Sequence, residues 1–312
     1  MSVNRTPIAL FTFNRPQHTQ LALDNLSRCD RYDECEIFIF SDGAKDEKSV
    51  NNVELTRAIL WTFAQKQKNV SIIERPENWG LAKNITHGVS DLCDSYGRAI
   101  VIEDDHQINQ YFINYMLSAL DRYQDVDQVG QISAYMFPVT HPQKPDAFFL
   151  PLMTTWGWAT WERVWHKVDW EPKNVREQLS DPEIRYRFDL NDSYPYTKML
   201  LDRLDGKNQS WGILFWWNMF LAGKLALHPR HSLVWVGGFD GTGVHSGNQS
   251  IPQVGKMGVQ NFEFAQTMTF PDKIEIDRLS FERIKNHLRY NYQPDIKDRV
   301  IRKLRKILNK LV

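Results

Sequence analysis

The chain has 312 residues, of which 42% are hydrophobic and 24% are charged. This composition is usual for a globular protein and excludes a mostly disordered chain, a collagen-like fibre and a coiled coil. Lys and Arg together number 38, as do Asp and Glu, so overall charge does not favour nucleic acid and we expect no such partner.

Short apolar runs alternate with stretches of helical spacing through the first 125 residues. Strands are expected at 8–13, 35–40, 70–73 and 99–102, and helices at 15–28, 50–67 and 80–95. This alternation predicts an α/β fold with a mostly parallel, doubly wound sheet that helices cover on both faces. We therefore expect residues 1–125 to form one half of a single domain.

Residues 126–290, the expected second half of that domain, are rich in aromatic side chains. Nine of the eleven tryptophans lie between Trp156 and Trp235. Trp158, Trp161 and Trp165 have the spacing of one helix face, which favours packing in a core. Strand signals are short and helical signals interrupted, at 148–150 and 232–236 and at 158–165, 193–203 and 215–222 respectively.

The chain ends in a basic segment behind a mildly acidic body. Residues 296–312 hold seven basic side chains and one acidic one, and their apolar residues fall on one helical stripe. The pattern predicts a basic amphipathic helix over 291–312 and is typical of a helix that lies on an anionic membrane. A helix docked on an acidic surface of the body would show the same pattern.

The sequence shows neither a membrane span nor an export signal. No apolar run approaches the ~18–20 residues that a spanning helix needs, and no long apolar segment follows the N-terminus. Cys29, Cys35 and Cys93 lack the spacing of metal ligands and are expected to be free thiols in a reducing compartment. We therefore expect a cytoplasmic protein that associates peripherally with the inner face of the membrane.

Polar residues follow each expected strand of the first half. Ligands of doubly wound sheets bind at the carboxyl ends of strands, so these residues are expected to share one site. Three adjacent carboxylates, here called the acidic motif, need a compensating charge, which a divalent cation supplies together with substrate phosphates. The four polar groups are Asn14-Arg15, Ser41-Asp42, Glu74-Arg75 and, as the acidic motif, Glu103-Asp104-Asp105.

The glycine patterns of the common phosphate-binding loops are missing from the sequence. Neither Gly-x-x-x-x-Gly-Lys-Ser/Thr nor Gly-x-Gly-x-x-Gly follows the first expected strand, which argues against P-loop and dinucleotide sites. A metal-bound diphosphate without a glycine cradle points instead to nucleotide-sugar chemistry.

Several segments, in their order and spacing, resemble GT-A fold glycosyltransferases. The nucleotide-binding half is matched by IALFTFNRP, SDGAKDE, ERPENWGLAKNI and VIEDDHQIN, whose acidic motif resembles the DXD metal motif. TWGWATWERVW and the stretch from SWGILFWW to GFDGTGVHSG resemble bacterial, family-2-like members, distantly similar to N-acetylglucosaminyltransferase I. The resemblance covers about residues 5–290 and implies a GT-A fold.

The resemblance implies nucleotide contacts for four residues. Arg15 and Asp42 would contact the nucleotide, with Asp42 holding the base or ribose. Lys83 would lie near the diphosphate, and Asp104 would face the ribose or the donor sugar.

The resemblance also implies a Mn²⁺ or Mg²⁺ site. Asp105, helped by Glu103, would hold the cation. His245 matches a late His-x-Gly element that supplies a further metal ligand in some relatives. Imidazole is a good ligand for Mn²⁺, and the glycines around His245 allow close approach of the backbone.

Trp156 and Trp211 are the residues best placed to stack on a sugar, since a pyranose offers an apolar face to an aromatic ring. In many relatives an acidic residue follows the second of these tryptophans, whereas this chain has Gly212.

An inverting transferase needs a general base to take the proton of the acceptor hydroxyl. With Gly212 in place of an acid, Asp240 is the preferred candidate, ahead of Asp205 and Glu162. Asp240 could instead be a turn residue or an acceptor ligand.

The resemblance implies a metal-dependent, inverting, hexosyltransferase-type enzyme. It would move a sugar from a nucleotide diphosphate donor, preferably UDP-linked, to a glycan or lipid-linked oligosaccharide, as in polysaccharide biosynthesis. One alternative is a sugar-1-phosphate nucleotidyltransferase, although FNRPQ is not the Gly-rich, Arg-containing loop such an enzyme should carry. A second is a non-catalytic glycan-binding module, which Gly212 favours and the intact acidic motif disfavours.

Overall fold

The structure is a computed structural model that describes residues 5–141, 145–237 and 268–292. Contacts divide the chain into two compact units. The larger unit takes in the described parts of Met1–Pro138, Pro142–Trp170 and Ser210–Ile276, and the smaller unit those of Val139–His141, Glu171–Gln209 and Asp277–Val312. Both predicted halves, 1–125 and 126–290, contribute to the larger unit.

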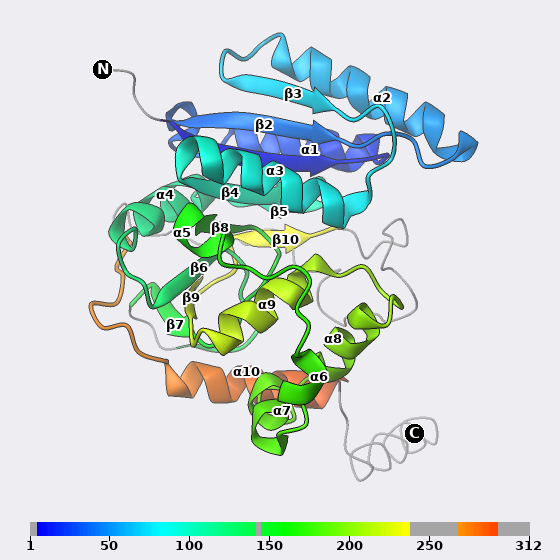
Figure 1. Cartoon of the computed structure of the whole chain (residues 1–312). Coiled ribbons are helices and arrows are strands. Elements are labelled where there is room, and N and C mark those ends of the chain that lie inside the picture. Colours follow the sequence, from blue (N-terminus) through cyan, green and yellow to red (C-terminus); the bar gives the residue numbers. More distant parts are fainter. Residues whose placement is uncertain (1–4, 142–144, 238–267, 293–312) are drawn as a thin grey trace, which may run out of the picture. The chain divides into compact units, whose positions relative to one another are not determined.

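A mostly parallel sheet forms the centre of the larger unit (Figure 1). In the described part of the chain it has eight strands in the order β3-β2-β1-β4-β8-β6-β9-β7. β8 and β7 run antiparallel to their neighbours, and the other pairs are parallel. The strands are β1 (Thr6–Thr12), β2 (Cys35–Ser41), β3 (Val70–Glu74), β4 (Arg98–Glu103), β6 (Val129–Ser133), β7 (Ala147–Leu150), β8 (Trp158–Trp161) and β9 (Leu225–Pro229).

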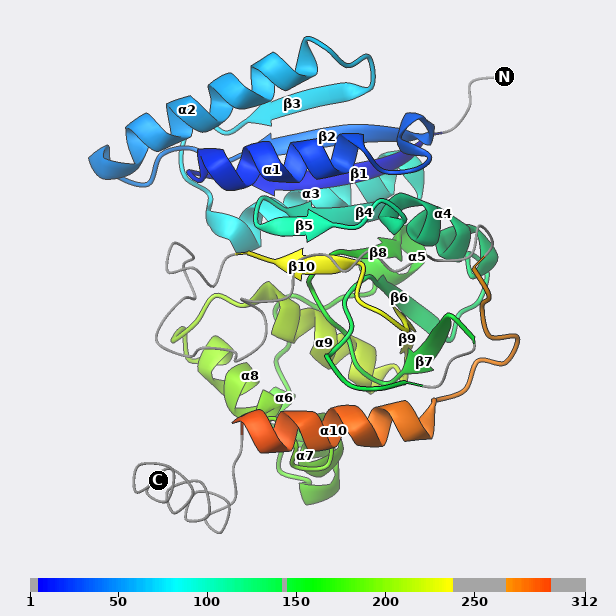
Figure 2. The same cartoon turned by 180° about the vertical axis from the view of Figure 1, so that it is seen from behind.

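The first four strands confirm the predicted doubly wound α/β sheet. Every residue of β1 is buried, as expected for an apolar strand covered on both faces. Helix α3 (Gly80–Tyr96) covers one face, and α1 (Pro16–Ser27) and α2 (Glu47–Ala64) cover the other (Figures 1 and 2). A short 3₁₀ turn (Tyr32–Glu34) precedes β2.

Local sequence determines where these helices begin and end. Pro16 occupies the first position of α1, where its missing N–H costs nothing. Asp46 and Ser49 form a capping box at the start of α2. Helix α3 ends at Gly97, whose φ of 74° is readily adopted by glycine.

The order of the strands reverses between β1 and β4. The chain winds outward from β1 through β2 to β3 and then returns to β4 on the other side of β1. Such a reversal is the point at which doubly wound sheets bind ligands, outside the carboxyl ends of the strands. Asn14-Arg15 follows β1 here, and the acidic motif ends β4.

The aromatic half contains β6, β9, α6 (Val175–Gln178) and α7 (Pro182–Phe188), which the sequence analysis did not predict, and one predicted helix differs in the structure. The prediction that Trp158, Trp161 and Trp165 lie on one helix face was wrong. Residues 158–161 form β8 between β4 and β6, and only α5 (Glu162–Trp165) is helical. Core packing of the three side chains is confirmed, since each is at most 2% exposed. Alternation along the strand turns Trp158 toward Trp165, whereas the Trp161 indole donates to the Leu120 carbonyl at 3.3 Å.

The remaining elements of the larger unit pack around this half of the sheet. Helix α4 (Phe112–Arg122) contacts β8 and β6. Helix α9 (Trp211–Leu221) begins at Ser210, whose hydroxyl accepts from the Ile213 N–H at 3.3 Å. β5 (His106–Ile108) and β10 (Val234–Val236) form a separate antiparallel pair directly after the acidic motif.

The smaller unit is helical. Arg289 of its last helix donates to the Asn191 carbonyl at 3.1 Å and the Ser193 hydroxyl at 3.2 Å, which holds that helix to the loop before α8. Its helices are α6 (Val175–Gln178), α7 (Pro182–Phe188), α8 (Tyr196–Leu204) and α10 (Arg278–Tyr292).

Two further predictions concern thiols and membrane contact. Cys29, Cys35 and Cys93 are free and buried, and burial raises the pKa of each thiol to about 12. Among the described residues, no helix is both long and apolar enough to cross a bilayer. The basic segment 296–312 lies outside the described residues.

Candidate functional site

The site is built around Arg15, which reaches from the end of β1 to the end of β4. Arg15 stands at the N-cap of α1, where its carbonyl accepts from the Thr19 N–H at 2.9 Å. Its Nη1 lies 3.0 Å from Asp105 Oδ2, and its Nη2 pairs with Asp104 Oδ1. The structure thus brings together three residues that the sequence predicted to share a site.

Asp104 fastens the ends of the two strands to each other. Its side chain is 3% exposed, and its Oδ2 accepts from the Phe13 N–H at 3.4 Å. Its own N–H donates to the Phe11 carbonyl at 3.0 Å. Asp104 is therefore a buried carboxylate held between β1 and β4, whereas Asp105 keeps 14% of its side chain exposed.

The acidic motif carries more negative charge than Arg15 neutralises. Burial, followed by repulsion from Asp105 and Asp104, raises the pKa of Glu103 well above its usual range, with Arg15 opposing. Burial also raises the pKa of Asp104, again against Arg15. Burial alone would lower the pKa of Arg15, but the two aspartates raise it. These shifts fit the predicted need of the motif for positive charge.

His106 is a residue of this site that the sequence analysis missed. Its Nδ1 accepts from the Glu103 N–H at 3.0 Å, so the neutral ring carries its proton on Nε2. That Nε2 lies 3.7 Å from Asp105 Oδ1. Burial lowers the pKa of His106 to about 4. The position of His106 directly after the acidic motif was the sequence feature that could have identified it as a residue of this site.

Asp42 holds the loops after β2 and β3 together. Its Oδ1 accepts from the N–H groups of Gly43 at 2.9 Å and Trp79 at 2.8 Å. Its Oδ2 accepts from the Gly80 N–H at 2.9 Å and from Asn78 Nδ2 at 3.0 Å. A carboxylate offers about four acceptor positions, so all are in use within the chain. Contact of Asp42 with a nucleotide stays a prediction.

Gly43 shows how closely these two loops approach. A Cβ at Gly43 would lie 2.4 Å from the carbonyl carbon of Glu77, a backbone atom that cannot move aside alone. Only glycine therefore allows the loop after β2 to meet the loop before α3.

Lys83 lies on α3 beside a half-buried tryptophan. Its Nζ is 4.1 Å from the centre of the Trp79 ring, and the Arg75 guanidinium carbon is 3.8 Å from the same ring. Lys83 itself is exposed. A cationic edge therefore adjoins the loop that Asp42 holds. Contact of Lys83 with a diphosphate stays a prediction.

The two tryptophans expected to stack on sugar lie in different surroundings. Trp211 is 6% exposed and packs against Trp158, with ring centres 5.2 Å apart. This burial leaves little of the Trp211 ring face accessible to a sugar. Trp156 is half-buried against Tyr135, at 4.6 Å between ring centres. Trp158 of β8 pairs with Val101 of β4, and the two strands are antiparallel. Trp156 therefore lies beside the carboxyl end of β4.

Gly212 packs closely against the side chain of Thr155. Gly212 lies in the first turn of α9. A Cβ at this position would be 2.9 Å from Cγ2 of Thr155, closer than such atoms ordinarily approach. An aspartate or glutamate there would require Thr155 to move.

The alternative bases are poorly placed or poorly tuned. Trp161 pairs with Arg98 at the start of β4, so Glu162 lies at the end of that strand opposite to the acidic motif. Asp205, in the smaller unit, has its pKa lowered by Lys207 and Arg176, which makes it a weaker base.

Asp240 and His245 lie outside the described residues. Gly237, the last described residue before them, donates its N–H to the Asp105 carbonyl at 2.8 Å.

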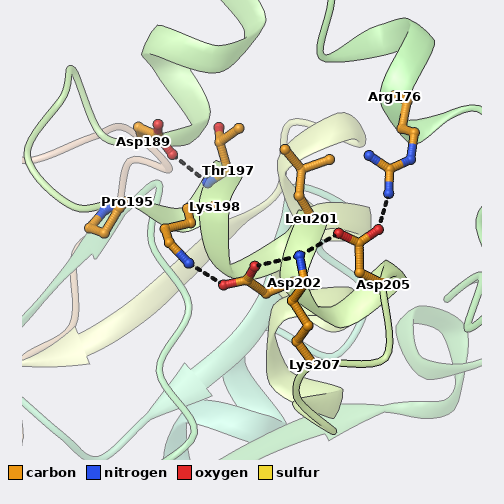
Figure 3. Close-up of a pocket in the computed structure, with 9 residues that line it drawn as sticks. All are labelled: Arg176, Asp189, Pro195, Thr197, Lys198, Leu201, Asp202, Asp205 and Lys207. Atoms are coloured by element: carbon orange, nitrogen blue, oxygen red, sulfur yellow. Dashed lines mark hydrogen bonds and ion pairs between the residues drawn. The ribbon is translucent and has the colours of Figure 1, made fainter.

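The smaller unit has an open pocket of about 560 Å³ (Figure 3). Each basic side chain around it pairs with an aspartate: Arg176 and Lys207 with Asp205, and Lys198 with Asp202. The pocket is thus bordered by a surface network of ion pairs. Its lining residues are Arg176, Asp189, Pro195, Thr197, Lys198, Leu201, Asp202, Asp205 and Lys207.

A family model described as glycosyl transferase family 2 matches residues 8–182, more than half of the chain. The chain belongs to this family. The predicted resemblance to GT-A glycosyltransferases is confirmed at this level, and the likeness to N-acetylglucosaminyltransferase I stays a prediction. The comparison with curated proteins finds no match.

Solved structures of other glycosyltransferases are similar at low identity. Mannosyltransferase PcManGT from Pyrobaculum calidifontis, in complex with GDP-Man and Mn²⁺, is 12% identical, with a TM-score of 0.40 over 70% of this chain and 69% of that one. S. aureus TarS 1–349 is 11% identical, with a TM-score of 0.43 over 75% of this chain and 61% of that one. Glucosyl-3-phosphoglycerate synthase from Mycobacterium tuberculosis is 10% identical, with a TM-score of 0.36 over 54% of this chain and 61% of that one.

The contacts of Asp42 generate a stability prediction. Asp42→Ala removes the acceptor of four N–H groups, so the free energy of unfolding should fall by at least about 1.5–3 kcal/mol, the range for a single hydrogen bond to a charged group. Urea denaturation of the protein without nucleotide measures it. Asp33→Ala, at an exposed carboxylate beside β2, is the control. Equal midpoints for the two variants would contradict a structural role for Asp42.

Proposed function

We propose that this family 2 glycosyltransferase is metal-dependent and inverting, and that it transfers a hexosyl group from a nucleotide diphosphate donor. UDP is the proposed carrier, and the acceptor is a hydroxyl of a glycan or lipid-linked oligosaccharide, as in polysaccharide biosynthesis. The observation that supports this most is the acidic motif at the reversal point of the sheet, where Arg15 meets Asp104 and Asp105.

The residues of the acidic motif fit a divalent cation that is shared with a diphosphate. No three His, Cys, Asp or Glu side chains within the described ranges are arranged as a complete metal site. Mg²⁺, however, is usually bound by one or two carboxylates together with substrate phosphates and water. Asp105 is the partly exposed carboxylate of the motif, and no described residue donates a hydrogen bond to the Glu103 carboxylate. When bound, a divalent cation would stabilise the negative charge of the leaving diphosphate.

The chain's own residues would bind and orient the donor. Arg15 offers a planar fork of N–H donors that suits phosphate oxygens, and exposed Lys83 offers a second positive charge. Asp42 would act on the nucleotide through the loops it holds. Asp104, whose side chain is 3% exposed, would act by holding Arg15 and not by facing the ribose or donor sugar. Trp156, at the same edge of the sheet, would offer its ring to the sugar.

We propose Asp240 as the group that takes the proton from the acceptor hydroxyl, and His245 as a further metal ligand. Both assignments rest on sequence. Gly212 packs closely against Thr155, and a non-catalytic glycan-binding module stays the alternative that this glycine favours.

The metal assignment predicts the behaviour of Asp105→Ala. UDP should raise the melting temperature of the wild type much more with Mn²⁺ than with EDTA, because a ligand at 100 times its Kd stabilises by about 2.7 kcal/mol. Asp105→Ala should lose that increment. Asp125→Ala, at an exposed residue before β6, should keep it. An unchanged response in Asp105→Ala, measured by thermal denaturation, would refute the assignment.

The base assignment predicts a selective loss of turnover. Asp240→Asn should lower kcat by about 10²–10⁴-fold while leaving donor affinity nearly unchanged, because only proton transfer is removed. Steady-state kinetics with a fixed acceptor and titrated donor measures both. If kcat survives and the acceptor KM rises, Asp240 binds the acceptor and is not the base.

We further propose that residues 296–312 bind an anionic membrane from its cytoplasmic side. Their net charge is +6, and each Lys or Arg near such a surface contributes about 1 kcal/mol. Removing 296–312 should abolish co-sedimentation with anionic vesicles and leave the melting temperature unchanged. Neutral vesicles should bind neither protein. Equal sedimentation of full-length and truncated protein, or a lowered melting temperature alone, would favour a helix docked on the body.

A further inference from the structure

Arg15 already occupies the position toward which a cation would be drawn. Its Nη1 lies 3.0 Å from Asp105 Oδ2, an oxygen of the carboxylate proposed to hold the metal. Its Nη2 simultaneously pairs with the buried Asp104. One guanidinium therefore spans both aspartates, and only 17% of its side chain is exposed.

The backbone of Arg15 is fixed, but its side chain has an alternative. Pro16 restricts the residue before it, and the Thr19 N–H holds the Arg15 carbonyl at 2.9 Å. The backbone of Arg15 therefore stays beside the carboxyl end of β1. A guanidinium fork fits carboxylate and phosphate oxygens equally well, so either partner is open to the same side chain.

Charge decides which partner is preferred. With all three carboxylates ionised, the state that a bound cation would favour, the acidic motif carries a formal charge of −3 against +1 from Arg15, which leaves −2. A divalent cation would cancel this remainder, and Arg15 and the cation would then both compete for Asp105. Once the cation screens Asp105, the guanidinium is less strongly held there. A diphosphate arriving with the cation supplies the anion that Arg15 then lacks.

We propose, resting on the function proposed above, that Arg15 is an internal counter-ion that competes with the divalent cation for Asp105. When the cation binds, Nη2 of Arg15 stays paired with Asp104 and Nη1 passes from Asp105 to the donor diphosphate. The empty enzyme then binds free metal weakly. Metal and nucleotide each strengthen the binding of the other by one common factor, as thermodynamic linkage requires.

The test compares Mn²⁺ binding with and without UDP, followed through the electron paramagnetic resonance signal of free Mn²⁺. The proteins are wild type, Arg15→Gln, Arg15→Lys and Arg31→Gln. The last is the matched control, because Arg31 pairs with Glu34 at 2.8 Å ahead of β2, at the opposite edge of the sheet, and its loss changes net charge equally.

Wild type and Arg31→Gln should bind Mn²⁺ weakly alone and about 5–150-fold more tightly with UDP, the usual range of coupling between sites. Arg15→Gln should bind Mn²⁺ alone at least about fivefold more tightly than wild type and gain less from UDP. Arg15→Lys keeps the charge with a single contact, so its affinity should lie between the two. If Arg15→Gln is too unstable to titrate, Arg15→Lys decides alone.

Equal or weaker binding of Mn²⁺ alone to the Arg15 variants would overturn the counter-ion role while leaving the metal site intact. Absence of Mn²⁺ binding from every protein, with UDP as well as without it, would instead refute the metal dependence proposed above. The two failures are therefore distinguishable.

Discussion

The pairing of Arg15 with Asp104 and Asp105 is the interaction on which the rest of the site depends. Asp104 is almost fully buried, and a buried carboxylate without a partner would cost several kcal/mol. The guanidinium compensates that charge and joins the end of β1 to the end of β4 across the reversal point of the sheet. Arg15 neutralises only one of the three carboxylates when all are ionised. A divalent cation bound together with a diphosphate could neutralise the rest.

A second carboxylate performs a structural task one strand away. Asp42 collects four N–H groups from the loops after β2 and β3, and Gly43 lets those loops meet at backbone distance. The first turn of α3, which carries Trp79 and Lys83, is thereby held in position before any ligand arrives. Such preorganisation lowers the ordering cost of binding.

In the aromatic half, packing decides what each tryptophan can do. Trp211 joins Trp158 in the core and offers little surface, whereas Trp156 stays at the sheet edge where β4 ends. Gly212 sits against Thr155, so a larger side chain at this position would require Thr155 to move.

The sequence by itself determined the alternation of strands and helices, the parallel sheet, the place of the acidic motif and the family resemblance. The expected strand at 35–40 is β2, Cys35–Ser41, because apolar runs and their polar ends are local properties of the chain. Tertiary structure alone decided that residues 158–161 are a strand, since their tryptophan spacing also suits a helix and only pairing with β4 and β6 selects between the two. It likewise decided the four partners of Asp42, the contact of His106 with Glu103 and the burial of Trp211. These features depend on contacts between residues that are distant in sequence. A local sequence pattern does not specify which of those residues meet across the sheet.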